Sequence, residues 1–206
     1  MSLSREVLLE RMKAGTVWKE RLIVEPFFPD SIDYSSAAAS LDFHLGNRFT
    51  YLRSRRAAQH DPLSSEPGRD VIPSERFIPM GQDFSLEPGH IVLGTTLEWF
   101  RFPSDMMAYV IGRSIWGRRG LLIVTAQAVH PGSSGTITLE MSNLGEVALT
   151  LRPGTSIGQL FFHRIEKVDG AAADDLTRHS PFSGAVRPIL GKYKQTKVEQ
   201  LLLGLR

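Results

Sequence analysis

Between residues 71 and 166 the chain alternates short apolar segments with turn residues, at a spacing of about 8–12 residues. Pro-Gly pairs, which favour tight turns, recur at 88–89, 131–132 and 153–154. This pattern predicts an all-β barrel or a jelly-roll-like sandwich. The expected strands are 22–24, 40–45, 49–52, 90–96, 97–102, 108–111, 121–125, 136–141, 147–151 and 157–164.

The two ends of the chain differ from this β core at 71–166. Residues 1–15 predict a short helix, because Ser4 suits an N-cap and Gly15 suits a stop signal. The polar, Pro- and Ser-rich stretch at 53–69 predicts a loop. Residues 170–206 form a tail that could close over a site. The 206 residues suit one domain that includes all of these parts.

Composition excludes several classes of function. The net charge of +2 gives no support for nucleic acid as a partner. The absence of cysteine excludes disulfides, thiolate catalysis and zinc ribbons. No stretch approaches the roughly 20 apolar residues of a membrane span, and the N-terminus lacks the apolar region of a signal peptide. We therefore expect a cytoplasmic protein with no membrane partner.

Glu140 is a carboxylate on a predicted strand with apolar neighbours. In the segment T-I-T-L-E-M, alternation places Ile137, Leu139 and Met141 on one face. Thr138 and Glu140 then share the other face. A partly desolvated carboxylate on a central strand suits general acid–base catalysis. The spacing alone does not exclude a structural role for Glu140, and in fact favours one. In that interpretation Glu140 lies on a solvated sheet face or forms a salt bridge to an arginine.

A loop at 112–120 combines three glycines with three arginines in the sequence G-R-S-I-W-G-R-R-G. Glycine lets the backbone approach an anion closely, and the arginine fork can bind two phosphate oxygens at once. The glycine spacing matches neither a Walker loop nor a dinucleotide-binding fingerprint. Two interpretations stay open, a phosphate-binding loop and a surface turn with a solvated basic face.

The histidines and serines give no support for a metal centre or a hydrolase triad. The six histidines do not pair at metal-ligand spacing, and the zinc deaminase signature is absent. No serine lies in a G-x-S-x-G motif. His130, in the turn V-H-P-G, is either a ligand contact or a turn residue bonded to backbone.

Taken together, these segments resemble the dCTP deaminase branch of the dCTP deaminase/dUTPase superfamily. The segment S-L-D-F-H-L-G-N at 40–47 is similar to the family's S-V-D-L-R-L-G-N, and the loop at 112–120 to its G-R-S-S-x-x-R-x-G. The resemblance covers most of the chain. Further matches follow in order, with L-E-P-G at 86–89, V-L-G-T-T-L-E at 92–98, T-A at 125–126, P-G at 131–132, T-L-E at 138–140 and P-G-T-S-I-G-Q-L at 153–160.

The resemblance implies a mainly β, distorted barrel of the dUTPase-like β-clip type, assembled as a homotrimer with sites at subunit interfaces. It implies zinc-independent hydrolysis of dCTP to dUTP and ammonia, with Glu140 as the acid/base and Mg²⁺ bound through the substrate triphosphate. Ser114 and Arg118 would complete the catalytic set. The implied substrate-binding residues are Arg113, Thr125, Ala126, His130, Thr138, Phe182, Lys192 and Gln195.

The chain departs from the family pattern at several ligand-holding positions. Ile115 replaces the second serine of the loop, Ala128 replaces an arginine, and His130 replaces the aspartate before Pro-Gly. In the tail, Gln195 is displaced relative to the family's K-Y motif, and Phe182 lacks a phenol hydroxyl. Each hydrogen bond lost to a charged ligand costs about 1.5–3 kcal/mol.

Three functions therefore stay open within the superfamily. The first is deamination of a cytosine deoxynucleotide, most simply dCTP. The second is a nucleotide-binding or structural trimer without turnover. The third is a bifunctional deaminase and diphosphohydrolase, although a pure diphosphohydrolase is disfavoured because His130 occupies the turn where that chemistry uses an aspartate.

Overall fold

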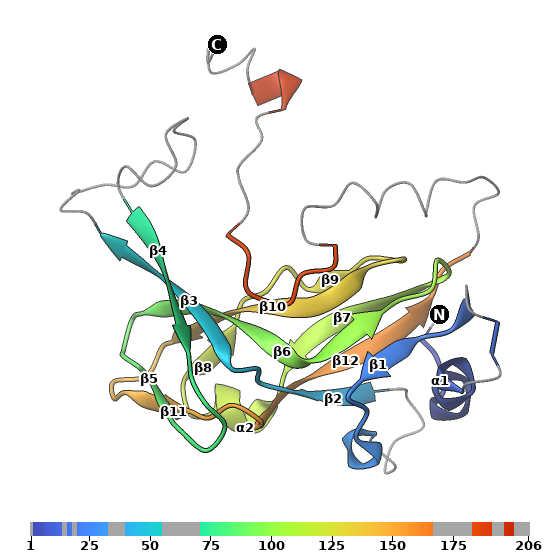
Figure 1. Cartoon of the computed structure of the whole chain (residues 1–206), viewed down its shortest axis with the longest axis horizontal. Helices are drawn as coiled ribbons and strands as arrows, with labels where there is room; N and C mark the ends of the chain where they lie inside the picture. Colours follow the sequence, from blue (N-terminus) through green and yellow to red (C-terminus); the bar gives the residue numbers. More distant parts are fainter. Residues whose placement is uncertain are drawn as a thin grey trace.

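The computed structural model describes residues 2–13, 16–17, 20–32, 40–54, 71–166, 183–190 and 196–199. Antiparallel strands are the main secondary structure of these residues (Figure 1). In chain order, the elements are α1 (Arg5–Met12), β1 (Ile23–Glu25), η2 (Pro29–Ser31), β2 (Ser40–His44), β3 (Arg48–Ser54), β4 (Val71–Phe77), β5 (Phe84–Leu86), β6 (Ile91–Arg101), β7 (Met106–Gly112), α2 (Ser114–Gly117), β8 (Leu121–Ile123), β9 (Ala128–Val129), β10 (Ser134–Asn143), β11 (Leu149–Leu151) and β12 (Ser156–Arg164).

The strands form three sheets around a common core. The largest has the order β4-β3-β6-β10-β8, with β1 also pairing with β6. A second has the order β2-β12-β7-β9, and β11 pairs with β5 in a third. The predicted mainly β fold is confirmed, and within the described residues the three sheets stay separate and do not close into one ring.

Phenylalanine side chains from all three sheets fill the core. Phe43 of β2 and Phe162 of β12 are fully buried, as are Phe49 of β3 and Phe100 of β6. The Phe49 ring stacks on that of Phe84 in β5, with centroids 4.6 Å apart. Burial of large aromatic side chains supplies much of the free energy that holds sheets together.

The pairing of β6 with β10 is interrupted at one place. Thr136 pairs with Trp99 and Thr138 with Thr95, so two steps along β10 match four along β6. The Thr96 hydroxyl lies at this interruption, where it donates to the carbonyl of Glu98 at 2.8 Å and accepts from the Ile137 N–H at 2.9 Å. A β-bulge of this kind re-aims the neighbouring side chains.

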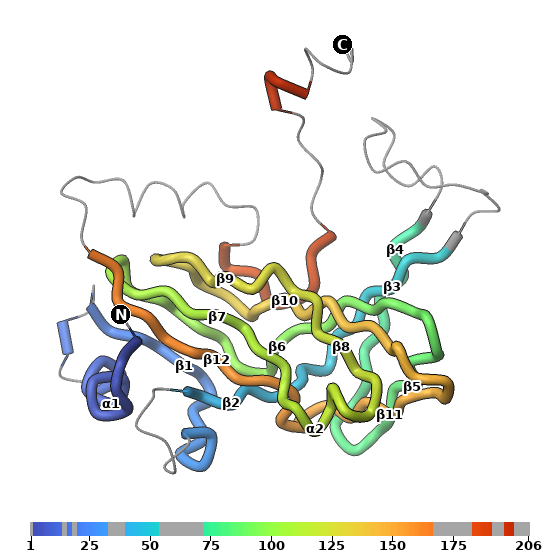
Figure 2. Tube along the Cα trace, turned by 180° about the vertical axis from the view of Figure 1, so that it is seen from behind, coloured from blue at the N-terminus to red at the C-terminus, as the bar shows by residue number. Residues whose placement is uncertain are grey.

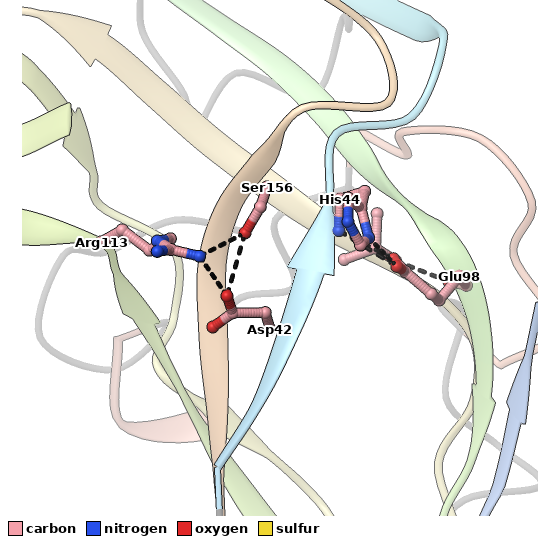
Figure 3. A network of polar contacts seen from close by, with 6 residues as sticks. Asp42, His44, Glu98, Arg113 and Ser156 are labelled. Atoms are coloured by element: carbon pink, nitrogen blue, oxygen red, sulfur yellow. Dashed lines mark hydrogen bonds and ion pairs between the residues drawn. The ribbon is translucent and has the colours of Figure 1, made fainter. Parts of the chain in front are cut away.

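A buried carboxylate supports the interrupted part of β6. Glu98 is 2% exposed and accepts from the backbone N–H of His44, at 3.0 and 3.2 Å from its two oxygens. The Nδ1 atom of His44 lies 2.6 Å from Glu98 Oε1 (Figure 3). These contacts tie β6 to β2 across two sheets, because His44 ends β2.

Several predicted boundaries need correction. The two strands expected at 90–96 and 97–102 are one strand, β6, because hydrogen bonding continues on both sides of the bulge. The loop expected at 53–69 is wrong at its start, since β3 extends to Ser54. Residues 55–70 lie outside the described residues. The helix α1 was predicted, and Ser4 Oγ accepts from the Val7 N–H as its cap.

A described part of the C-terminal tail, residues 183–190, lies against β10 (Figure 2). We call residues 183–190 the docked segment. Ala185 forms a parallel bridge with Gly135, and its carbonyl accepts from the Thr136 N–H at 2.7 Å. The Gly184 N–H donates to the Ser134 carbonyl at 2.7 Å. The docked segment thus occupies an edge of β10 that β8 leaves open, because β8 pairs only with residues 141–143.

None of the described helices is long and apolar enough to cross a membrane.

Substitution of Gly135 by alanine should detach the docked segment. A Cβ at this position would lie 2.8 Å from the backbone N and O of Ala185, and the φ angle of +125° disfavours any side chain. We expect a loss of about 1–3 kcal/mol in the free energy of unfolding, measured by denaturant titration.

Gly89→Ala is the matched control, since Gly89 has φ +72° but nothing within 4 Å of its Cβ position. Equal losses in the two variants would contradict the close approach of the docked segment.

Candidate functional site

A cavity of about 420 Å³ lies between β10, the loop that follows β8 and the docked segment. This volume falls within the range of about 300–1,000 Å³ that is typical of small-molecule sites. Its lining residues are Leu93, Phe100, Phe102, Thr125, Ala126, Ala128, Val129, His130, Ser133, Ser134, Gly135, Thr136, Ile137, Thr138, Glu140, Ser183, Ala185, Ile189 and Leu190. We call this space the main cavity.

Five of the predicted catalytic and substrate-binding residues line the main cavity together, namely Thr125, Ala126, His130, Thr138 and Glu140. Two hydrogen bonds bring the loop and β10 into contact. The Glu140 N–H donates to Thr125 Oγ1 at 2.9 Å, and the Val124 N–H donates to the Glu140 carbonyl at 2.7 Å. Residues fifteen positions apart in the sequence therefore form one wall.

The carboxylate of Glu140 has neither a hydrogen bond nor an ion pair with any described residue. Its side chain is partly buried and lines the main cavity. The alternative interpretation from the sequence, a salt bridge to an arginine, is therefore not observed among the described residues. A partly desolvated carboxylate without a partner is available to a ligand.

The predicted alternation on β10 is observed, with one addition at Ile137. Leu139 and Met141 face the core as expected and are fully buried. Ile137 packs against the core but is only partly buried, and it also lines the main cavity beside Thr138, where the register with β6 is interrupted. This side chain gives the cavity an apolar contact next to Glu140.

His130 lines the main cavity from the turn that follows β9. Its backbone carbonyl accepts from the Ser133 N–H at 3.2 Å, as expected for a turn. Its imidazole makes no hydrogen bond to a described residue. The ring is thus free to contact a ligand, whereas Ala128 presents only a methyl group to the same space.

Arg113, Ser114 and Arg118 do not line the main cavity. They lie at α2, a four-residue helix inside the predicted loop, and the side chains of Ser114 and Arg118 are exposed. Figures 1 and 2 both place α2 at the edge of the molecule opposite the docked segment. Within one chain, the predicted catalytic residues therefore form two separate groups.

The Arg113 guanidinium already has protein partners. One of its terminal nitrogens donates to the carboxylate of Asp42 and, at 2.9 Å, to Ser156 Oγ (Figure 3). Ser156 Oγ also donates to Asp42 at 3.2 Å. These contacts from β2 and β12 fix the direction of Arg113 and leave the rest of its fork available to an anion.

Sequence reasoning missed the apolar lining of the main cavity. Ile189 and Leu190 reach it from the docked segment, and Phe100 and Phe102 from the end of β6 and the residue just beyond it. Alternation along β6 could have indicated Phe100, but no local signal places the docked segment there. The predicted ligand contacts in the tail, Phe182, Lys192 and Gln195, lie outside the described residues.

The described lining of the main cavity carries negative charge but no positive charge from lysine or arginine. Among its described lining residues Glu140 is the carboxylate, and neither lysine nor arginine is present. In the part of the chain that the structure describes, no group of three or more His, Asp or Glu side chains could hold a metal ion. The cavity as described suits a neutral base and sugar better than a phosphate chain.

Among solved structures, the fold is similar to that of 2'-deoxycytidine 5'-triphosphate deaminase from Agrobacterium tumefaciens. The TM-score is 0.55 at 22% sequence identity, over 86% of this chain and 52% of that one. This chain therefore spans about half the length of that structure. At this identity, the likeness concerns the fold alone.

Sequence relatives are closer. A dCTP deaminase from Halorubrum lacusprofundi is 38% identical over 167 residues, which cover 81% of this chain and 78% of the relative. A protein named "dCTP deaminase, dUMP-forming" from Mycolicibacterium paratuberculosis is 39% identical over 168 residues, or 80% and 81% of the two chains. Another of that name from Dictyoglomus thermophilum is 37% identical over 148 residues, or 70% and 73%.

The family model described as dCTP deaminase-like matches residues 2–165, a range that contains α1, all the strands and Glu140. The chain therefore belongs to the dCTP deaminase-like family.

Proposed function

We propose that this protein hydrolyses dCTP to dUTP and ammonia, with Glu140 as the acid/base residue. The observation that carries the proposal is the unpartnered Glu140 carboxylate in the main cavity, next to Thr125 and Ala126. The names of the relatives support the same substrate, since they are dCTP deaminases at 37–39% identity.

The chemistry needs one group that can both accept and deliver protons. Glu140 takes a proton from a water molecule, and the hydroxide adds to C4 of cytosine as the C4–O bond forms. Glu140 delivers this proton to N3. It then takes the proton of the new C4 hydroxyl and passes it to the departing amino group, so that C4=O forms as the C4–N bond breaks and ammonia leaves. Backbone groups at Thr125 and Ala126 would hold the edge of the base, and Thr138 and His130 would contact the sugar side.

We propose a zinc-independent reaction, because the sequence lacks cysteine and the zinc deaminase signature. Mg²⁺ usually binds through a carboxylate or two and the substrate phosphates. The described residues contain no acidic cluster for it, so a Mg²⁺ ion would enter with the triphosphate, whose negative charge it would partly neutralise.

The phosphates require cations that the described lining of the main cavity does not contain. We propose that Arg113, Ser114 and Arg118 of a neighbouring copy supply them in a homotrimer. The exposure of α2 supports this arrangement. Three exposed apolar side chains support it as well, one on α2, one on β8 and one in the loop that follows β8. Ile115, Leu122 and Val124 are 52%, 45% and 51% exposed, as expected of a surface that another subunit covers.

A second function, release of dUMP by additional cleavage of the triphosphate, is favoured by one observation. Two of the relatives described above carry the words "dUMP-forming" in their names. The same assay separates the two functions, because deamination alone releases ammonia and dUTP, whereas the bifunctional reaction also releases pyrophosphate.

Purified protein incubated with dCTP and Mg²⁺ should release ammonia. Glu140→Gln should lower kcat by about 100- to 10,000-fold, the usual contribution of a general acid–base group. Glu146→Gln is the matched control, because Glu146 is exposed in the turn before β11 and does not line the main cavity. Wild-type protein that leaves dCTP unchanged at high enzyme concentration would exclude the deaminase and favour a trimer without turnover.

Mixing two inactive variants tests whether a site draws on two subunits. Glu140→Gln and Arg118→Ala should each be inactive alone. When co-assembled in equal amounts, they should recover roughly a quarter of wild-type activity, because one site in four then joins an intact Glu140 to an intact Arg118. Co-assembled oligomers, isolated through two different affinity tags, that remain inactive would show that both residues act within one chain.

A further inference from the structure

A second cavity, of about 220 Å³, lies between the β3–β4 hairpin and the docked segment. We call it the arginine cavity. Three arginines and one carboxylate line it, so its charged lining is positive overall. The lining residues are Arg48, Phe49, Thr50, Glu75, Arg76, Phe77, Arg187 and Pro188.

The strand register brings four of these side chains to one face of the hairpin. Arg48 pairs with Phe77 and Thr50 with Glu75 across antiparallel strands, and directly paired residues share a face. The Arg48 guanidinium lies over the Phe77 ring, with its carbon 5.8 Å from the ring centroid. This stacking holds the arginine beside the cavity without neutralising its charge.

The positive charges of the arginine cavity are only weakly compensated. Arg187 lies 3.8 Å from Glu75, a long ion pair between two exposed side chains. Neither Arg48 nor Arg76 forms a salt bridge with a described residue. Exposed pairs of this kind contribute little, so a phosphate could replace Glu75 as the partner of Arg187.

Thr50 supplies an independent sign of a ligand. It is 3% exposed, and its Oγ1 is buried without a hydrogen-bond partner. Most buried hydroxyl groups in proteins are hydrogen-bonded, because an unpaired one costs free energy. A donor of this kind, in the lining of a cavity rich in arginine, suits an anionic oxygen.

We propose that the arginine cavity binds phosphate groups, through Arg48, Arg187 and the Thr50 hydroxyl. The proposal does not depend on the deaminase activity. The ligand is inorganic phosphate, pyrophosphate or the phosphate chain of a nucleotide, which share the same chemistry. Arg is suited to all three because its fork bonds two phosphate oxygens at once.

Bound phosphate would also stabilise the main cavity. Arg187 and Pro188 line the arginine cavity, while the next two residues of the docked segment, Ile189 and Leu190, line the main one. A phosphate bridging Arg48 and Arg187 would fasten the docked segment to β3. Any ligand of the main cavity that contacts Ile189 would then bind more tightly, and the coupling would be reciprocal.

Isothermal calorimetry with pyrophosphate, and separately with inorganic phosphate, tests the site. Arg48→Gln and Arg187→Gln should each weaken binding by at least about tenfold, the cost of one charged hydrogen-bond partner. Glu75→Gln should strengthen binding, because it removes a negative charge next to the ligand. Arg53→Gln is the control, since it removes the same charge from the same hairpin outside the cavity.

Two further binding experiments distinguish this site from the loop at α2 and identify the source of the phosphate. Arg113→Gln removes a cation of the loop at α2, so it should abolish only pyrophosphate binding at that loop. The binding that Arg48→Gln and Arg187→Gln weaken should persist in this variant, which separates the two sites. Saturation of the Glu140→Gln variant with dCTP shows whether a nucleotide's phosphate chain fills the site, because pyrophosphate binding would then disappear; retained binding identifies a free anion. Absence of saturable binding, or equal effects of Arg48→Gln and Arg53→Gln, would overturn the proposal. None of these binding measurements depends on turnover. Absence of phosphate binding would therefore be distinguishable from absence of the proposed deaminase activity.

Discussion

The attachment of β10 to β6 determines where the main cavity lies and what faces it. Thr96 joins the two strands at the point where their register is interrupted, because its hydroxyl accepts from the Ile137 N–H of β10 and donates to the Glu98 carbonyl of its own strand. Glu98 in turn is held by His44 from a different sheet. Because the interruption lies three residues before Glu140, β10 presents Ile137 and Thr138 to the cavity and still returns Leu139 to the core. The catalytic proposal for Glu140 depends on this local geometry.

The charged side chains are distributed so that base binding and phosphate binding would fall to different parts of the chain. Among the described residues, the main cavity has largely apolar walls and one carboxylate without a partner, and we propose that it holds the base and carries out the proton transfers. The arginines that we propose as phosphate contacts lie elsewhere, at α2 and in the arginine cavity. Arg113 is oriented by Asp42 and Ser156, and we propose that it contacts the phosphates of a nucleotide held in the main cavity of a neighbouring copy. A division of this kind makes the proposed activity depend on assembly, since neither group of residues is sufficient for the reaction alone.

Local patterns predicted the strands well, because alternation and Pro-Gly turns act over a few residues, and the Ser4 cap was predicted for the same reason. Local patterns failed where the structure depends on residues that are far apart in the sequence. The bulge opposite Ile137 needs Thr96 from another strand, and α2 lies in a Gly-rich loop that has no helical periodicity. The grouping of Thr125 with Glu140 was expected only from the family resemblance. The separation of Arg118 from Glu140 within one chain, and the pairing of Ala185 with Gly135, depend on tertiary contacts that no short segment encodes.

An experimental structure of the Glu140→Gln variant with dCTP bound tests the proposed site most directly. We expect cytosine in the main cavity, with C4 and its amino group facing residue 140, and the triphosphate on Arg113 of an adjacent subunit. A nucleotide whose base lies outside the main cavity, or whose phosphates contact only the chain that holds the base, would contradict the proposed site.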